Sequence, residues 1–357
     1  MINIDFLVAG CNTRCLHCYV NGGPALLMPI EDVLLCIEKL ETLAQYFLND
    51  TTFTLDHEPT NHPEIIRILQ AASQTRYIKN YHHGMTTGVG LMRRQDKDAV
   101  IKAYYDCGYD TFGITIHGNA PHHDEIVRRK GAYDTTVAAA TYLKSSGANI
   151  EVSLMLNRFF AEDASSISAM LQQLEPNYIG FVSPIFTPHV HMKDFEPYRA
   201  SMETVSAIRG YLSEWKQDEE AILKAAEQNT IEGAVKRLIA GVDLSRLFDL
   251  EQDELYLTLH PDCQLYVGNS GAETQCLGDL RHIDLEETAS IIKALPGNRD
   301  YGAFYDPAIL PSTDALTVAL EELPQNLIYG DFESVIYRGL TELGVPTKIL
   351  ALNKCLQ

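Results

Sequence analysis

Three cysteines near the N-terminus are the residues whose types and spacing point most directly to chemistry. Cys11, Cys15 and Cys18 stand in the segment Cys-Asn-Thr-Arg-Cys-Leu-His-Cys. Three thiolates on one short loop can bind three irons of a four-iron cluster, and the fourth iron then has no protein ligand. Such an iron is free to bind a small molecule. The segment therefore predicts a cluster that takes part in a reaction.

A structural zinc site is the alternative for the same cysteines. Zinc needs four ligands, and His17 is a candidate for the fourth, but it lies between Cys15 and Cys18 on the same loop. We therefore favour iron. A non-enzymatic zinc or iron–sulfur protein stays open as the alternative from another functional class.

The elements predicted around these cysteines alternate between strands and helices. Strands separated by helices indicate βαβ units and a parallel sheet. Six such units are too few for a closed eight-stranded barrel, so we expect an α/β fold with a partial (β/α)6 barrel over residues 1–195. The predicted strands are 2–8, 52–56, 81–88, 111–116, 149–156 and 178–183, and the predicted helices are 29–48, 63–72, 98–107, 133–145 and 165–174.

The remainder of the chain has a different pattern. Residues 196–250 have an acidic, helix-rich sequence, and we expect a helical connector there. A predicted pair of strands over 254–268 then begins a small α+β domain that spans residues 251–357.

Composition restricts the partners and the compartment. The chain has 48 Asp and Glu against 28 Lys and Arg, a formal net charge of −20, so we expect neither nucleic acid nor a membrane surface as a partner. No apolar stretch is long enough to cross a bilayer, and the first residues lack the features of a signal peptide. We therefore expect a cytoplasmic protein, whose eight cysteines bind metal or pack in the core instead of forming disulfides.

The spacing Cys-x3-Cys-x2-Cys, followed directly by the aromatic Tyr19, resembles the signature of the radical S-adenosylmethionine (SAM) superfamily. The resemblance implies a [4Fe–4S] cluster on Cys11, Cys15 and Cys18, with SAM bound to its open iron. It also implies a reaction in which a flavodoxin- or ferredoxin-type protein supplies an electron. SAM is then cleaved to methionine and a 5′-deoxyadenosyl radical, and this radical takes a hydrogen atom from a substrate.

The same resemblance implies residues that contact SAM. After the second predicted strand, Glu58 and Pro59 match the end of the family's Gly-Gly-Glu-Pro segment, although Asp56 and His57 replace the two glycines. Glycine lets a ligand approach the backbone closely, so this replacement changes the geometry of the contact. The positions that match the family's SAM contacts are Tyr19, Glu58, Thr115, Arg128 and Asn157.

Two of these positions have specific implied partners. Thr115 would contact the SAM ribose, and Arg128, with Arg129 as the alternative, would pair with the methionine carboxylate. His122 and His123 precede this arginine pair, and we expect them in a loop because adjacent side chains rarely converge on one metal.

Cysteines in the second half of the chain resemble the C-terminal extension called SPASM, or twitch in its shorter form. Cys263 precedes a predicted hairpin, and Cys276 ends a Gly-x4-Cys segment. The resemblance implies one second [4Fe–4S] cluster on Cys263, Cys276 and Cys355, whose fourth iron takes water, substrate, His260 or Asp262. The alternative is that Cys263 and Cys276 are small buried side chains in a fold that survives without its cluster.

The resemblance leaves the substrate open. The barrel is expected to start at residue 2, without a leader-binding domain before it, which favours a small molecule of secondary metabolism. Oxidation, rearrangement or epimerisation are the expected outcomes. A ribosomally made peptide is the alternative substrate.

Overall fold

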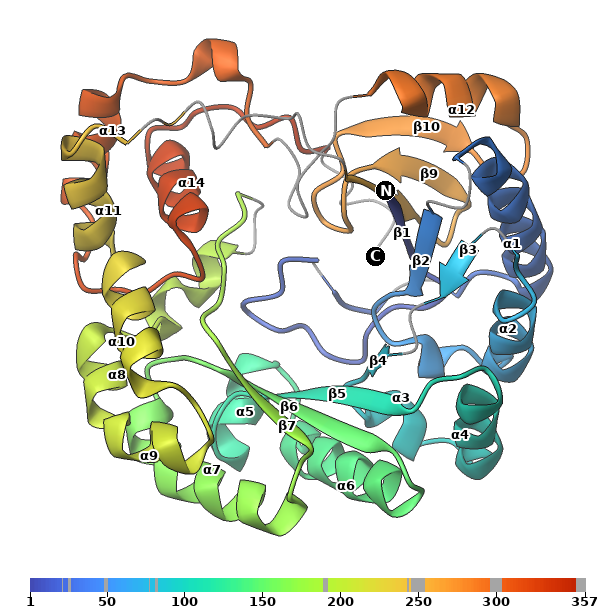
Figure 1. Ribbon diagram of the computed structural model, residues 1–357, viewed down its shortest axis with the longest axis horizontal. Helices are drawn as coiled ribbons and strands as arrows, with labels where there is room; N and C mark the ends of the chain where they lie inside the picture. The colour runs from blue at the N-terminus through green and yellow to red at the C-terminus, as the bar shows by residue number, and fades with distance from the viewer. Residues whose placement is uncertain are drawn as a thin grey trace.

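The computed structural model describes residues 1–20, 22–24, 27–47, 51–76, 78–80, 83–188, 192–242, 244, 254–295 and 304–350. Its strands form one sheet of order β10-β9-β8-β1-β2-β3 and a second of order β4-β5-β6-β7 (Figure 1). All pairs from β8 to β3, and all pairs in the second sheet, are parallel. The strands are β1 (Ile2–Phe6), β2 (Thr51–Leu55), β3 (Ile78–Asn80), β4 (His83–Met85), β5 (Thr111–Ile116), β6 (Asn149–Met155), β7 (Tyr178–Val182), β8 (Leu255–Leu259), β9 (Gln264–Val267) and β10 (Gln275–Asp279).

Helices connect the parallel strands, and in Figure 1 α6 and α7 lie along the outer side of the β5–β7 sheet. Short 3-10 helices occur at Gln45–Phe47, Pro59–Asn61, Met192–Tyr198 and Pro307–Ile309. The α-helices are α1 (Ile30–Ala44), α2 (Ile65–Ala72), α3 (Val89–Met92), α4 (Lys97–Asp106), α5 (Ala120–Ile126), α6 (Ala132–Ser145), α7 (Phe160–Leu174), α8 (Met202–Ala207), α9 (Arg209–Glu214), α10 (Glu219–Gln228), α11 (Ile231–Ile239), α12 (Leu285–Ala294), α13 (Thr313–Glu321) and α14 (Phe332–Glu342).

Burial follows the periodicity of the sequence. In β6 the alternate residues Ile150, Val152 and Leu154 are fully buried, as expected for one face of a strand. In α1 the buried residues recur at three- and four-residue steps, with Val33, Ile37 and Leu40 among them. These faces meet in one large core that also includes residues of β8 and β9.

The expected α/β fold with a parallel sheet is confirmed, and the strands from β1 to β7 follow one another in chain order, consistent with a partial barrel. The strand expected over 81–88 is instead described as β3 and β4, and residues 81 and 82 lie outside the described part. Gly88, with φ 74, caps the start of α3 in a left-handed conformation, so the extended backbone stops before it.

The first strand of the expected C-terminal domain joins the sheet of the barrel. Residues 255–259 pair in parallel with β1, from Ile2↔Leu255 to Phe6↔Leu259. A second core combines α11 with α13 and α14, so parts of the expected connector and of the expected C-terminal domain pack together. The pairing of β8 with β1 joins residues far apart in the sequence, so local periodicity carries no information about it.

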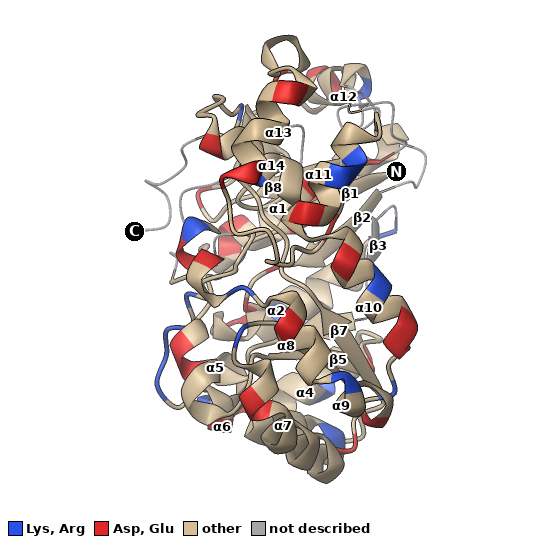
Figure 2. Cartoon of the chain, turned by 90° about the vertical axis from the view of Figure 1, so that its left-hand side faces the viewer, with Lys and Arg blue, Asp and Glu red and all other residues tan. Residues whose placement is uncertain are grey.

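The surface of the chain is acidic. Figure 2 shows Asp and Glu spread over many of the helices, with fewer Lys and Arg between them, in keeping with the net charge of −20. Among the described helices, none combines the length and the apolar character that crossing a membrane requires.

Candidate SAM and iron–sulfur site

The cysteine loop follows β1 and is held by the segment at the end of α5. Arg14 and Leu16 donate their amide hydrogens to carbonyl oxygens at the C-terminal end of α5, at 3.1 and 2.9 Å. The guanidinium of Arg129 donates to the carbonyl of Asn12 at 2.9 Å. These bonds fix a loop that has no regular secondary structure of its own.

The sulfurs of Cys11 and Cys18 lie together beside Gly22, and Cys15 is near enough for its charge to affect the pKa of both thiols. A Cβ atom at Gly22 would be 3.2 Å from Sγ of Cys18 and 3.3 Å from Sγ of Cys11, and the Gly22 amide donates to Sγ of Cys18 at 3.1 Å. Burial and the charge of Cys15 raise the pKa of Cys18 to about 12. Burial and the charge of Cys18 raise the pKa of Cys11 well above its usual value. Buried thiols that oppose one another's ionisation fit a cationic cluster, which binds them as thiolates.

A cavity with an empty volume of about 560 Å³ adjoins this loop. Threonines form much of the wall, among them Thr86, Thr87 and Thr115, and no Lys or Arg belongs to the described lining. Four histidines also line it: His17, His57, His117 and His123.

Three of these histidines form a hydrogen-bonded chain. Nδ1 of His123 accepts from the backbone amide of His117 at 3.3 Å, so this nitrogen carries no proton in the neutral ring. Nδ1 of His117 lies 3.4 Å from the same atom and can donate to it, and Nε2 of His117 then accepts from Nε2 of His17 at 2.6 Å. Burial lowers the pKa of His17 and of His123 to about 4, and that of His117 well below its usual value. These three imidazole rings, called the imidazole chain below, are therefore neutral at pH 7.

His57 has different surroundings from the other three. Its side chain is only 1% exposed, and its Nδ1 lies 3.4 Å from Oδ2 of Asp56. Burial is the largest single influence on His57 and lowers its pKa, but the charge and hydrogen bonding of Asp56, together with the charges of Asp5 and Glu273, raise the pKa overall. Burial opposes ionisation of Asp56 as well, yet His57 lowers the pKa of that carboxyl. The two residues form a buried ion pair at the edge of the cavity.

Glu58 is fully buried and connects the ends of β2 and β4. Oε2 of Glu58 accepts from the Thr87 amide at 2.7 Å and from the Thr87 hydroxyl at 2.6 Å. The Thr86 hydroxyl donates to the same carboxylate at 3.0 Å, and the Thr60 hydroxyl donates to Oε1. Glu58 therefore positions the two threonines that line the cavity, and Glu58 itself is not part of the described lining.

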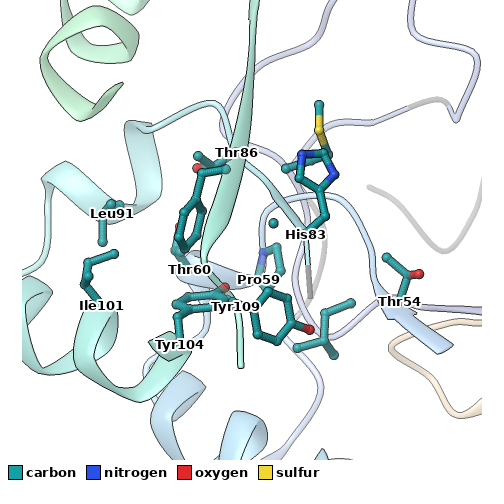
Figure 3. Close-up of a pocket in the computed structure, with 13 residues that line it drawn as sticks. Thr54, Pro59, Thr60, His83, Thr86, Leu91, Ile101, Tyr104 and Tyr109 are labelled. Carbon is teal, nitrogen blue, oxygen red and sulfur yellow. The ribbon is translucent and has the colours of Figure 1, made fainter. Parts of the chain in front are cut away.

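A second pocket lies behind these residues, with an empty volume of about 420 Å³ (Figure 3). Its described lining includes Thr60, Thr86, Tyr104 and Tyr109, and Figure 3 shows Thr60 next to the two tyrosines. Its described walls consist mostly of buried side chains of the core and contain no Asp, Glu, Lys or Arg.

Of the five residues expected to contact SAM, only Thr115 belongs to the described lining of the cavity. Asn157 is fully buried, and its amide donates to the carbonyls of His117 at 2.7 Å and Met155 at 3.0 Å. Asn157 thereby holds the turn that carries His117. Tyr19 is 39% exposed on the cysteine loop. The predicted SAM contacts of all these residues stay predictions.

The two candidate arginines lie in different places. Arg128 has a positive φ of 54 and pairs with Asp194 at 2.8 Å, where both side chains are 45% exposed. Arg129 reaches the cysteine loop through Asn12, as described above. Neither guanidinium belongs to the described lining of the cavity.

The expectation that His122 and His123 lie in a loop is wrong, because both belong to α5. Asn119 caps this helix by accepting from the His122 amide, and a proline follows at its first turn, which together favour a helix start. The two rings do point to different groups. His122 contacts Asp163 at 2.8 Å and Glu162 at 3.1 Å, whereas His123 lines the cavity.

The cysteines of the expected second cluster face different groups. Cys263, in the turn between β8 and β9, is fully buried, and it lies close enough to Cys36 on α1 for the two thiols to affect each other's pKa. Cys276 on β10 is exposed and lies 3.5 Å from the side-chain oxygen of Gln264. Cys355 lies outside the described residues.

A comparison with protein families matches residues 6–166 to the model of the Radical SAM superfamily. The matched segment contains the three cysteines of the loop and almost all of the cavity, and the expected radical SAM domain is confirmed. Members of this superfamily are enzymes. A comparison with curated protein sequences finds no match.

Solved structures share the fold of this chain. They include anSMEcpe with bound AdoMet (TM-score 0.55, 12% identity, 96% of each chain) and the same protein with AdoMet and the Cp18Cys peptide (TM-score 0.54, 12% identity, 96% of each chain). Streptococcus suis SuiB bound to its precursor peptide SuiA is also similar (TM-score 0.53, 9% identity, 93% of this chain and 75% of that chain). At these identities the likeness concerns the fold alone.

Proposed function

We propose that the protein is a radical SAM enzyme with a [4Fe–4S] cluster on Cys11, Cys15 and Cys18. The single observation that carries this proposal is the grouping of three half-buried cysteines on one loop beside a cavity, within the segment that matches the superfamily. When bound, the cluster supplies the electron that cleaves SAM to methionine and a 5′-deoxyadenosyl radical, which takes a hydrogen atom from a substrate carbon. A flavodoxin- or ferredoxin-type protein is the proposed reductant.

The residues of the chain bind and orient the cofactors and exclude water. The α5 end and Arg129 hold the cysteine loop, and Glu58 holds Thr86 and Thr87 at the cavity wall. Thr115, at the end of β5, offers a hydroxyl to the SAM ribose. The neutral imidazole chain of His17, His117 and His123 forms part of the cavity wall.

A reconstitution experiment tests this proposal. Protein loaded anaerobically with iron and sulfide, then given dithionite and SAM, should release 5′-deoxyadenosine slowly without further substrate. Cys18→Ala should lose this release. Cys107→Ala should retain it, because Cys107 lies at the end of α4 and belongs neither to the cysteine loop nor to the described cavity lining. A tetrahedral zinc in the native protein, or equal release from Cys18→Ala, would contradict the proposal.

For the substrate, a small molecule is our first proposal and a ribosomally made peptide the second. The peptide alternative has a specific observation in its favour, since anSMEcpe with the Cp18Cys peptide and SuiB with SuiA share this fold over nearly the whole of this chain. Incubation with candidate peptides and with small molecules, each under turnover conditions, distinguishes them by which one accelerates the release of 5′-deoxyadenosine.

A second [4Fe–4S] cluster on Cys263, Cys276 and Cys355 is a further part of the proposal. It is favoured by the resemblance of the Cys276 segment to twitch domains. It requires Cys263 to leave its contact with Cys36.

A further inference from the structure

A histidine stands in this chain where the resembled Gly-Gly-Glu-Pro segment has its second glycine. His57 has φ 64, in the left-handed region that a side chain of this kind adopts only at a cost. Its ring is buried with Nδ1 facing Asp56 at 3.4 Å, and Nε2 has no hydrogen-bond partner among the described residues. A strained backbone combined with an unpartnered buried donor suggests a site for a ligand group.

The ring lies at the cysteines. Cδ2 of His57, the ring atom next to Nε2, is 3.4 Å from the Cβ position at Gly22, and the sulfurs of Cys18 and Cys11 are 3.2 and 3.3 Å from the same position. The same ring lines the cavity, together with Cys15 and Thr87. His57 therefore stands between the expected cluster and the space that SAM would fill.

Charge distinguishes His57 from every other group of the described lining. That lining contains no Lys or Arg, and His117 and His123 are hydrogen-bonded to each other in the neutral imidazole chain. His57 alone has a carboxylate partner, Asp56, at 3.4 Å from Nδ1. A proton on Nδ1 faces Asp56, and a second proton on Nε2 has no protein acceptor within the part of the chain that the structure describes.

We propose that Nε2 of His57 donates a charge-assisted hydrogen bond to the carboxylate of SAM's methionine part, with Asp56 holding the ring from the other side. The inference rests on the proposed function. In this chain His57 takes the place of an arginine, because Arg128 pairs with Asp194 at the surface. The bond orients the methionine part so that its amino and carboxylate groups meet the open iron together.

The test compares two ligands on anaerobically reconstituted protein. His57→Asn removes the charge, and asparagine tolerates the left-handed backbone. We expect the Kd for SAM to rise about 10- to 100-fold, the range for loss of one charge-assisted bond. The Kd for S-adenosyl-3-methylthiopropylamine, which lacks the carboxylate, should change less than about threefold relative to wild type, within the context spread of such values. The iron content and the electron paramagnetic resonance signal of the reduced cluster without SAM should match wild type.

Controls separate this inference from the proposed function. His282→Asn makes the same chemical change at an exposed residue and should leave both Kd values unchanged. His57→Gly, which restores the family's residue, should lose SAM affinity as His57→Asn does, so a folding defect in one variant does not decide the matter.

Equal SAM affinity of the His57 variants and wild type would overturn the inference while the proposed function stands. Equal losses for both ligands would also overturn it, because they would indicate a structural role. A selective loss of SAM affinity in Arg128→Ala would assign the carboxylate to Arg128 instead. Wild-type protein that assembles no cluster would overturn both proposals.

Discussion

Replacement of Glu58 by glutamine tests the network that holds the cavity wall. The variant keeps the shape of the side chain but removes its charge and turns one acceptor oxygen into an NH2 donor. The amide oxygen of the introduced glutamine must stay at the Oε2 position, because the Thr87 amide donates there at 2.7 Å and cannot reverse its role. The Thr60 and Thr86 hydroxyls can rotate to accept from the new NH2 group.

The expected loss follows from the two bonds that remain at Oε2. Both the Thr87 amide and the Thr87 hydroxyl change from charge-assisted donors to neutral ones, at 2.7 and 2.6 Å from the acceptor. A bond to a charged group contributes about 1 kcal/mol more than a neutral one, so Glu58→Gln should lower the free energy of unfolding by about 2 kcal/mol. Because Thr87 lines the cavity, SAM affinity should fall as well.

Urea unfolding of the cluster-free protein under reducing conditions measures this change. Glu64→Gln is the matched control, since Glu64 forms an exposed pair with Arg67 at 3.5 Å and should change stability by less than about 0.5 kcal/mol. Equal unfolding free energies for the two variants would refute the argument that the hydrogen bonds of buried Glu58 stabilise the cavity wall.

Three further outcomes are expected. The cluster-free protein should lose stability as the pH falls from about 6.5 towards 4, because unfolded histidines take up protons that buried His17, His117 and His123, with their lowered pKa values, do not. His123→Gln should reduce this dependence in urea titrations at several pH values, with the contribution of the other two histidines remaining. Gly22→Ala should lower iron content severalfold, since its Cβ would lie 3.2 and 3.3 Å from the two sulfurs, and full loading would contradict the geometry. Cys276→Ala should reduce iron from about eight to about four per chain while SAM cleavage persists, and an unchanged iron content would remove the second cluster from the proposal.

Local patterns predict the elements of this fold well but say little of how distant elements meet. The alternation in β6 and the periodicity in α1 arise from neighbours in the chain, and both elements were expected within a few residues of their bounds. The pairing of β8 with β1 joins residues about 250 positions apart, and no local signal encodes it. The helix at 120–126 was missed although Asn119 and the proline after it are a start signal.

In the candidate site, too, local features were predictable from the sequence and long-range contacts were not. The spacing of Cys11, Cys15 and Cys18 is a local feature and indicated the superfamily that the match over residues 6–166 confirms, while the cluster on these cysteines stays a prediction. The imidazole chain joins His17 to His117, one hundred positions later, so it appears only once the fold brings the loop after β1 and the end of β5 to the same cavity. His57 had a local signal in the replaced glycine, but its burial and its missing partner required the structure.

The parallel pairing of β1 with β8 has a consequence for how the protein is made. Until Leu259 has left the ribosome, β1 has β2 on one side and an open backbone edge on the other, with Ile2, Ile4 and Phe6 in the strand. Unpaired apolar edges invite association between chains. Nascent chains shorter than this length should therefore depend on chaperones, and the cysteine loop that follows β1 should acquire its metal only late in synthesis.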